Sequence, residues 1–232
     1  MPPKRLVLFC EGQGDEGASR LLVDRLLTQL DRTRQHLFLD PDSFCIGDLT
    51  KLVNKDRKKF EKKEGETFWV NKLASAAKRK NVGAMLLLLD GDYDGELFHT
   101  SDGHRSFCAK DFALLLAQQA QSAGAGRNFS LAVVFARQEF ESWLIAGCPE
   151  FHEYAPKKPE EIEKLRGAKE WIGKHRHSFY KPTRHQAELT QTLDIHAPLL
   201  NQMRSFQRLK NAMSQLVQAV CENQPVCTPG KI

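Results

Sequence analysis

The chain of 232 residues is long enough for one substantial domain, or for one domain with an appendage, and its 41% hydrophobic and 27% charged residues exclude a disordered protein. The longest apolar run, Ala84–Leu89, is far shorter than the ~20 residues that span a bilayer, and no signal-peptide core follows Met1, so we expect a cytoplasmic protein without a membrane partner. Six scattered cysteines without a CxxC pair argue against structural zinc and a disulfide framework, whereas a formal net charge of +5 with clustered basic residues is compatible with a nucleic-acid partner.

The first part of the chain alternates between strand-like and helix-like segments. Arg5–Cys10 is a short apolar run, and a glycine-containing turn separates it from leucines at helical spacing in Ala18–Leu30. Farther along, we expect strands at His36–Leu39, Val82–Leu89 and Leu131–Phe135, and helices at Phe68–Lys80 and Cys108–Ser122. This alternation predicts an α/β fold in which a parallel sheet of about four strands carries helices on both faces.

After Ala136 the pattern is helical, and we expect no further strand. Helices are predicted at Gln138–Ala146, Pro159–Lys174 and Pro198–Cys221. The sequence therefore divides into an α/β domain, residues 1–146, and a helical C-terminal extension, residues 147–232, that packs on it.

Acidic residues follow two of the expected strands. The first strand ends in EGQGDE, residues 11–16, and the third in DGDYDG, residues 90–95. Because the carboxyl ends of parallel strands meet at one edge of a sheet, we expect these acids to lie close together. Such crowding of like charges is unfavourable unless a cation holds them or their pKa values shift, and hard cations prefer oxygen ligands. The sequence thus predicts a Mg²⁺ or Mn²⁺ site among the acids of these two segments.

Other interpretations of these motifs are weaker. Gly12-x-Gly14-x-x-Gly17 has the spacing of a dinucleotide-binding fingerprint, but its loop carries three negative charges where a pyrophosphate would bind. Residues 90–95 match the first half of a calcium-binding EF-hand loop, but the twelfth position is Ser101 instead of Glu. A nucleotide triphosphatase would need a GxxxxGK[ST] loop, and the sequence has none. A purely structural role, in which the acids cap a helix and form a turn, stays open.

A Glu in a glycine-containing turn after the first strand, with Asp-x-Asp after the third, resembles the pattern of the Toprim fold of type IA and type II topoisomerases, bacterial primases and OLD-family nucleases. More closely, the chain resembles an uncharacterised prokaryotic Toprim-like family that is often encoded beside an ATPase. Almost the whole chain takes part in this resemblance, through Glu11–Gln13 with Asp15, Asp90–Asp92, Glu139–Leu144, Tyr180-Lys181 and Ser205-Phe206.

The resemblance implies that Glu11 is the catalytic acid or base, that Asp90 and Asp92 bind metal, and that Asp15 is a second metal ligand, as in OLD-like nucleases. The close family commonly has Glu at the place of Asp15, so Glu16 is an alternative ligand. The resemblance also implies a partner ATPase and a role as the effector of an anti-phage defence system, neither of which composition indicates.

Two glutamates follow the fourth expected strand. Glu139 and Glu141 flank Phe140, so on a helix they do not share one face, and we expect only one of them at the site. We favour Glu141 as a catalytic residue because it lies nearer Trp143 in the family-like motif. A packing stripe with both glutamates in solvent fits the pattern equally well.

Basic residues point to the phosphate backbone of a nucleic acid. Lys181 follows the aromatic pair Phe179-Tyr180, and we expect it to stabilise phosphate charge near the scissile bond, although a plain surface lysine is the alternative. Tyr180 is a candidate for base stacking, with core packing the commoner role. The residues expected to bind the backbone, from this region and from the charge run Lys51–Lys63, are Lys58, Lys59, Lys62, Arg176 and Arg184.

These patterns together predict a metal-dependent nuclease. With the ligands that the resemblance implies, Glu11, Asp90 and Asp92 together with Asp15 would hold Mg²⁺ or Mn²⁺. The bound ion would activate water for phosphodiester hydrolysis and stabilise the leaving oxygen. The substrate, DNA or RNA, and the assembly of the chain into a homo-oligomer stay open. The main alternative is a non-catalytic adaptor with a Toprim-like fold that binds a nucleic acid or an ATPase, and a dinucleotide-binding enzyme is the third.

Overall fold

The structure, a computed structural model, describes residues 2–47, 68–93, 96–100, 103–176 and 178–230. The basic segment Lys51–Lys63, with the candidate nucleic-acid ligands Lys58, Lys59 and Lys62, lies outside the described residues.

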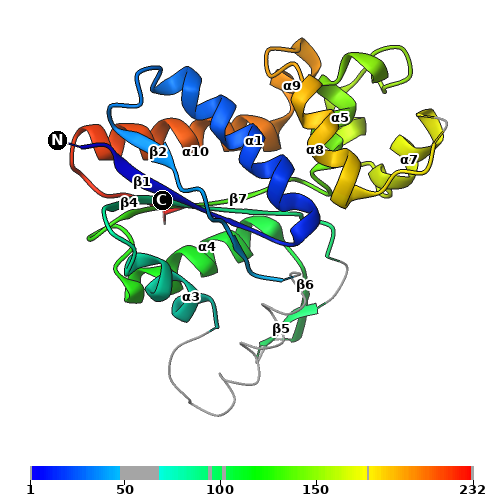
Figure 1. The fold of residues 1–232 in the computed structure, drawn as a ribbon. Helices are drawn as coiled ribbons and strands as arrows, with labels where there is room; N and C mark the ends of the chain where they lie inside the picture. Colours follow the sequence, from blue (N-terminus) through cyan, green and yellow to red (C-terminus); the bar gives the residue numbers. More distant parts are fainter. Residues whose placement is uncertain (1, 48–67, 94–95, 101–102, 177, 231–232) are drawn as a thin grey trace.

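A parallel sheet forms the centre of the molecule (Figure 1). Its strands follow the order β2-β1-β4-β7-β8, and β3 also pairs with β1, which gives six strands. The strands are β1 (Lys4–Cys10), β2 (Leu37–Leu39), β3 (Phe44–Cys45), β4 (Val82–Leu89), β7 (Ser130–Phe135) and β8 (Cys227–Thr228). A separate antiparallel pair consists of β5 (Glu96–Thr100) and β6 (Gly103–Ser106).

The predicted α/β class with a parallel sheet between helices is confirmed, but the sheet has six strands instead of about four. The expectation of no strand after Ala136 is wrong, because β8 pairs with Leu131 and Ala132 of β7. Both β3 and β8 have only two residues, which is too short for an alternation of apolar and polar residues to reveal a strand.

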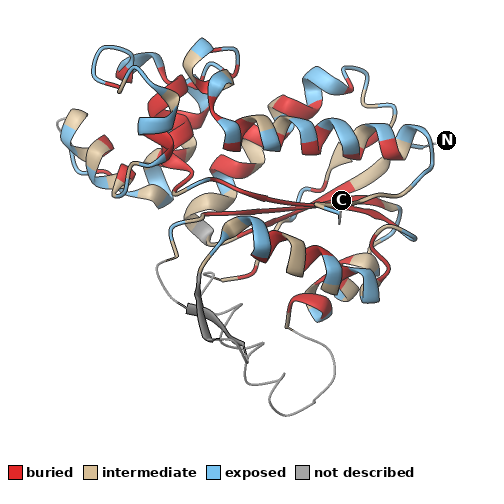
Figure 2. Ribbon diagram, turned by 180° about the vertical axis from the view of Figure 1, so that it is seen from behind, coloured by how far each residue is buried: buried red, intermediate tan, exposed pale blue. Residues whose placement is uncertain are grey.

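The central strands are apolar throughout because both of their faces are covered. In β1, Leu6 and Leu8 belong to one hydrophobic cluster, whereas Val7 and Phe9 belong to the other. The same alternation continues through β4 and β7. Helices α1 (Gln13–Leu30) and α10 (Arg204–Cys221) cover one face, and α3 (Phe68–Ala77) and α4 (Ala109–Ala120) cover the other (Figures 1 and 2).

A group of short helices lies beyond the carboxyl ends of the strands (Figure 1). Two segments that were each predicted as one continuous helix are each divided into two helices. Pro159–Lys174 is interrupted before Gly167, whose left-handed conformation (φ +70°) breaks the helix, and Pro198–Cys221 is interrupted at the extended residue Met203. The helices are α5 (Glu141–Gly147), α6 (Pro159–Glu163), α7 (Ala168–His175), α8 (Pro182–Thr192) and α9 (Pro198–Gln202).

Residues on both sides of the boundary expected after Ala146 share one core. The hydrophobic cluster on the α1 face contains Leu8 and Leu22 from the N-terminal part and Phe206 and Met213 from α10. Trp143 of α5 contacts Phe206, with ring centroids 5.7 Å apart. The C-terminal residues therefore complete the layer that covers this face of the sheet. Within the described residues, the helices lack the combination of length and apolar character needed to cross a membrane.

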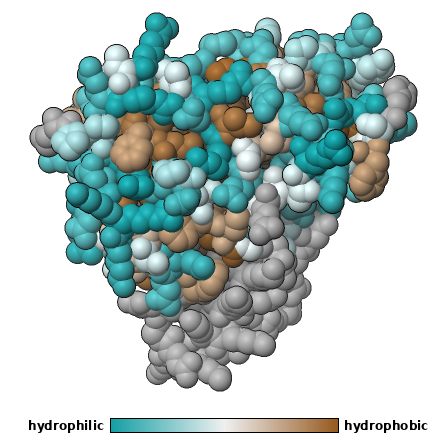
Figure 3. Space-filling model, viewed as in Figure 1, coloured by the Kyte–Doolittle hydropathy of each residue, from teal (hydrophilic) through white to brown (hydrophobic). Residues whose placement is uncertain are grey.

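The outside of the molecule in the view of Figure 1 is mostly hydrophilic, with hydrophobic residues showing between the polar ones (Figure 3). The described residues include only three large hydrophobic side chains that are strongly exposed, namely Leu30, Tyr154 and Phe179. Phe179 is the most exposed of them, at 83%, and it lies directly before the buried residue Tyr180.

Candidate active site

Three neighbouring strands bring acidic residues to the same edge of the sheet. β4 lies between β1 and β7, and Glu11 follows β1, Asp90 follows β4, and Glu139 and Glu141 follow β7. The chain proceeds outward from β1 to β2 on one side and from β4 to β7 on the other, so β1 and β4 flank the switch point where open α/β sheets bind ligands. Glu11 Oε2 accepts a hydrogen bond from the backbone N–H of Asp90 at 3.3 Å. The expected meeting of these two loops is therefore observed.

The loop after β4 rests directly on the loop after β7. Gly91 donates its backbone N–H to Gln138 O at 2.7 Å, and Asp90 Oδ1 accepts the N–H of Phe140 at 2.8 Å. A Cβ atom at Gly91 would lie 2.6 Å from the carbonyl oxygens of both Ala136 and Arg137. Glycine at this position thus permits the close approach that sets Asp90 beside the start of α5.

Lys169 of α7 lies among the carboxylates, and the sequence analysis missed it. Its Nζ is 3.8 Å from Asp90 Oδ2 and 4.0 Å from Glu141 Oε2, while its backbone N–H donates to Glu139 Oε2 at 3.2 Å. Nothing in the local sequence distinguishes this lysine from others of the predicted helix at Pro159–Lys174. Only the break before Gly167 and the packing of α7 beside α5 bring it to the site.

The expectation that only one of the two glutamates faces the site is wrong. Glu139 and Glu141 are both buried, and both lie next to Lys169. The physical reason is that α5 begins at Glu141, so Glu139 precedes the helix and does not follow helical geometry. The aromatic residues between and after them pack in the core as the alternative interpretation expected, with Phe140 against Trp143.

Burial and mutual repulsion shift the ionisation of the acids. Burial, together with the charges of Glu141 and Asp15, holds the pKa of Asp90 well above its ordinary value. Burial also raises the pKa of Glu141 to about 7, although the Lys169 ammonium opposes this shift, and burial raises the pKa of Glu139. Burial acts to lower the pKa of Lys169, but Glu141 and Asp90 outweigh it and raise that pKa.

The α8 side of the site holds Glu141 and Asp15 together. Glu141 Oε1 accepts hydrogen bonds from the Tyr180 hydroxyl at 3.0 Å and from Gln186 Nε2 at 3.3 Å, and the same Gln186 nitrogen donates to Asp15 Oδ1 at 3.1 Å. Burial and the Glu141 charge raise the pKa of the Tyr180 phenol, so it stays a proton donor. Because Tyr180 is 7% exposed and bonded to Glu141, it is not placed to stack on a base.

The two acids in the first turn of α1 face different surroundings. Asp15 lines a small cavity of about 10 Å³ together with Glu11 and Asp90. Glu16 accepts a hydrogen bond from Ser43 Oγ at 2.6 Å and lies 3.8 Å from Cys45 Sγ. Of the two candidate ligands, only Asp15 lies at the site.

The glycines of the dinucleotide-like spacing serve helix packing. A Cβ atom at Gly14 would lie 3.5 Å from Pro182 Cβ, and one at Gly17 would lie 3.5 Å from Ala187 Cβ. Both neighbours belong to α8, which covers the start of α1. The place where a pyrophosphate would bind is therefore taken by protein, against a dinucleotide site.

Several expected site residues lie outside the buried cluster. Asp92 is exposed, although its charge adds to the effect of burial in raising the pKa of Glu139. Lys181, which is also exposed, stands at the N-terminal cap of α8, where its backbone N–H donates to His185. Arg176 is 3.2 Å from Glu150, and Arg184 is 3.9 Å from Glu188. It is Tyr180, the residue before Lys181, that touches the cluster.

The motifs that carry the Toprim-like resemblance also meet in space. Trp143 Nε1 donates to Ser205 Oγ at 2.9 Å, and the backbone N–H of Ser205 donates to Glu163 Oε1 at 2.6 Å. With the contacts between Trp143 and Phe206 and between Tyr180 and Glu141, segments that are far apart in sequence enclose α5. These residues thus hold Glu141 in place.

The donor chemistry of the site is compatible with the divalent cation that the resemblance implies. Glu11, Asp15 and Asp90 line one cavity, and hard cations prefer oxygen ligands such as their carboxylates. Across the described part of the chain, however, no three His, Cys, Asp or Glu side chains form a group that could hold a metal ion. Because Mg²⁺ usually takes one or two carboxylates and completes its shell with water and phosphate, Glu11 and Asp90 are the residues that would hold it.

Comparison with known proteins adds no relative: no family model, curated protein or solved structure matches the chain. Fold and site define a class, namely a parallel α/β protein with a buried cluster of carboxylates around a lysine at the switch point of its sheet.

We predict that Gly91→Ala destabilises the protein by about 1–3 kcal/mol, because the added methyl overlaps two backbone carbonyl oxygens. Chemical denaturation measures the free energy of unfolding. Gly17→Ala is the matched control: its methyl meets Ala187 at an ordinary distance and lies inside α1, so it should be neutral or stabilising by up to about 1 kcal/mol. Equal stability of the Gly91→Ala protein and the wild type would contradict the close contact between the two loops.

The raised pKa of Glu141 predicts a loss of stability with rising pH. The folded protein, with a pKa of about 7, holds this proton more tightly than the unfolded chain, with the ordinary value of 4.5. Its contribution is complete below pH 4.5 and is lost as the pH rises through 7. Glu141→Gln should therefore lose less stability than the wild type between about pH 5 and about pH 8 in denaturation experiments. The exposed control Glu160→Gln should follow the wild type, and an unchanged slope in Glu141→Gln would count against the assignment.

Proposed function

We propose that the protein is a divalent-metal-dependent nuclease that hydrolyses phosphodiester bonds at the cluster formed by Glu11, Asp90, Glu141 and Lys169. The observation that supports this most directly is the placement of Asp90 between Glu11 and Lys169 at the switch point of the sheet. The resemblance to Toprim nucleases, which associates a Glu after the first strand with an Asp after the third, supports the same conclusion. A partner ATPase and a role in anti-phage defence rest on that resemblance alone.

The residues of the cluster have complementary roles in this proposal. Bound Mg²⁺ or Mn²⁺ supplies Lewis-acid stabilisation of phosphoryl oxygens and lowers the pKa of water. Glu11 and Asp90 hold the cation, and Asp15 contributes a further carboxylate on the same cavity. Glu141, with a pKa of about 7, can take up or release a proton near neutral pH.

Lys169 takes the role that sequence reasoning assigned to Lys181. A fixed ammonium group among carboxylates is placed to contact a phosphate oxygen that approaches the same edge, and its raised pKa keeps it charged. Lys181 and Arg184 are exposed beside the site and suit contacts with the flanking backbone. Phe179, at 83% exposure next to Tyr180, offers a flat surface on which an unpaired base can stack.

A non-catalytic adaptor is the second candidate, and one observation favours it. The hydrogen bonds of Tyr180 and Gln186 to Glu141, and the ion pairs of Lys169, are also what a buried polar network needs to be structurally satisfied. In that case the carboxylates would stabilise the joint between α5, α7 and α8 without acting on a substrate.

Cleavage assays with purified protein separate the two. We expect cleavage of labelled single-stranded or duplex DNA or RNA in Mg²⁺ or Mn²⁺ and its loss on chelation. Asp90→Asn and Lys169→Gln should each lower the rate by about a hundredfold or more. The controls are Glu16→Gln, which bonds to Ser43 away from the site, and Lys181→Gln, which lies at its rim, and both should stay within about tenfold of the wild type. Binding without cleavage in either metal, unchanged in Asp90→Asn, would favour the adaptor.

A separate prediction concerns the exposed ring of Phe179. If an unpaired base stacks there, Phe179→Ala should weaken the binding of single-stranded oligonucleotides by about 1–3 kcal/mol and affect duplexes less. Fluorescence anisotropy at fixed salt measures both affinities. Leu30→Ala removes another exposed hydrophobic side chain, at the far end of α1, and should have no effect. An equal loss for duplex and single strand in Phe179→Ala would contradict stacking.

A further inference from the structure

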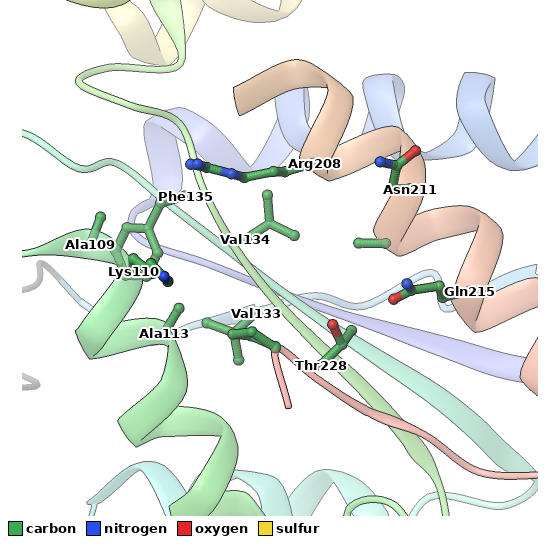
Figure 4. Close-up of a pocket in the computed structure, with 12 residues that line it drawn as sticks. Ala109, Lys110, Ala113, Val133, Val134, Phe135, Arg208, Asn211, Gln215 and Thr228 are labelled. Atoms are coloured by element: carbon green, nitrogen blue, oxygen red, sulfur yellow. The ribbon is translucent and has the colours of Figure 1, made fainter. Parts of the chain in front are cut away.

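A second hollow lies at the outer edge of β7, between the helices that cover the two faces of the sheet. It has a volume of about 300 Å³ and opens between α4 and α10, along the end of β7 (Figure 4). Its floor is the strand segment Val133–Phe135. None of the residues assigned to the proposed nuclease reaction lines it.

Within the described part of the chain, the edge of the sheet beside this hollow is only partly paired. β4 pairs with the whole of β7, but β8 pairs only with Leu131 and Ala132. After Thr228 comes Pro229, which has no N–H to donate and so ends the ladder. Among the described strands, none pairs with Val133–Phe135 on the side away from β4.

The backbone of this segment is oriented for pairing. Ala136 donates its N–H to Leu89 O in β4, and Leu131 donates its N–H to Val226 O on the opposite side. Because backbone groups alternate along a strand, those of Val133 and Phe135 point toward the hollow, as those of Leu131 point toward β8. An extended peptide in the hollow would continue the sheet at this edge.

The walls of the hollow set the chemistry of such a peptide. Ala109, Ala113 and Ala212 leave room on both sides for the alternating side chains of a strand. Lys110 of α4 and Arg208 of α10 are exposed on opposite sides of β7, near the start of their helices. No Asp or Glu is among the described residues that line the hollow. The site is therefore basic at its rim and apolar along its floor.

We propose that this hollow binds an extended, acidic segment of another protein, which adds to β7 as a further strand and places its carboxylates between Lys110 and Arg208. A second copy of the chain fits less well, since pairing the same edges across a twofold axis would bring two sets of these basic residues together.

The test uses a fluorescein-labelled peptide of alternating valine and threonine with two aspartates near its C-terminus. We expect saturable binding to the full chain below about 1 mM, weaker binding of the peptide with lysines in place of the aspartates, and loss of binding when alternate backbone nitrogens are methylated. The double variant Lys110→Glu/Arg208→Glu should weaken binding of the acidic peptide by about tenfold or more and improve binding of the lysine peptide. Lys78→Glu/Arg204→Glu, which changes the charge equally outside the hollow, should bind like the wild type.

Several results would overturn the proposal. Absence of saturable binding by the acidic peptide at about 1 mM would do so. Equal affinity for the aspartate and lysine peptides would show that charge does not determine binding. Binding that survives N-methylation would show that the peptide does not pair with β7 as a strand. If sedimentation experiments show a dimer, and Ala113→Leu and Ala212→Leu dissociate it, then the hollow binds a second copy of the chain instead of an acidic segment. Circular dichroism shows whether each variant is folded, and nuclease activity is not part of this test.

Discussion

The burial of like charges next to one another is the constraint on which the site depends. Asp90 and Glu141 come from the ends of adjacent strands, and Glu11 bonds to the backbone of Asp90 from a third. Such a cluster is unstable without positive charge and hydrogen-bond donors. Lys169 provides the charge, and Tyr180, Gln186 and the N–H of Phe140 provide donors. The helices after β7 therefore complete the site as well as the core.

The architecture explains why those helices are where they are. Parallel strands deliver their carboxyl ends to one edge, and an open α/β sheet needs cover on both faces. α10 covers one face, together with α1. The helices α5, α7 and α8 lie beyond the ends of the strands, where Lys169 of α7 contacts Asp90 and the residues before and within α8 contact Glu141 of α5. Among the described strands, none pairs with Val133–Phe135 at the outer edge of β7, which is the basis of the second, independent binding proposal.

The parts of the fold with strong local signals could be predicted from sequence. The bounds of the strand Val82–Leu89 are predicted to the residue, because a long apolar run bounded by polar residues fits few structures other than a buried strand. The acids at the end of this strand and of the first strand then predict the observed contact between Glu11 and Asp90. The strands β3 and β8 could not be predicted, because two residues are too few to show the alternation of apolar and polar side chains that marks a strand. Lys169 could not be predicted for a different reason. Its place at the site depends on where α7 packs, and this long-range packing has no signature in the sequence around Lys169.

The most direct test of the account is a carbon-detected NMR titration of the side-chain carboxyl groups in the folded protein. Asp90 should titrate well above its ordinary pKa of 3.8 and Glu141 near a pKa of 7, and Lys169→Met should move both pKa values upward. If Asp90 and Glu141 titrate at their ordinary values and do not respond to Lys169→Met, the carboxylates are not crowded around the lysine, and the proposed site is wrong.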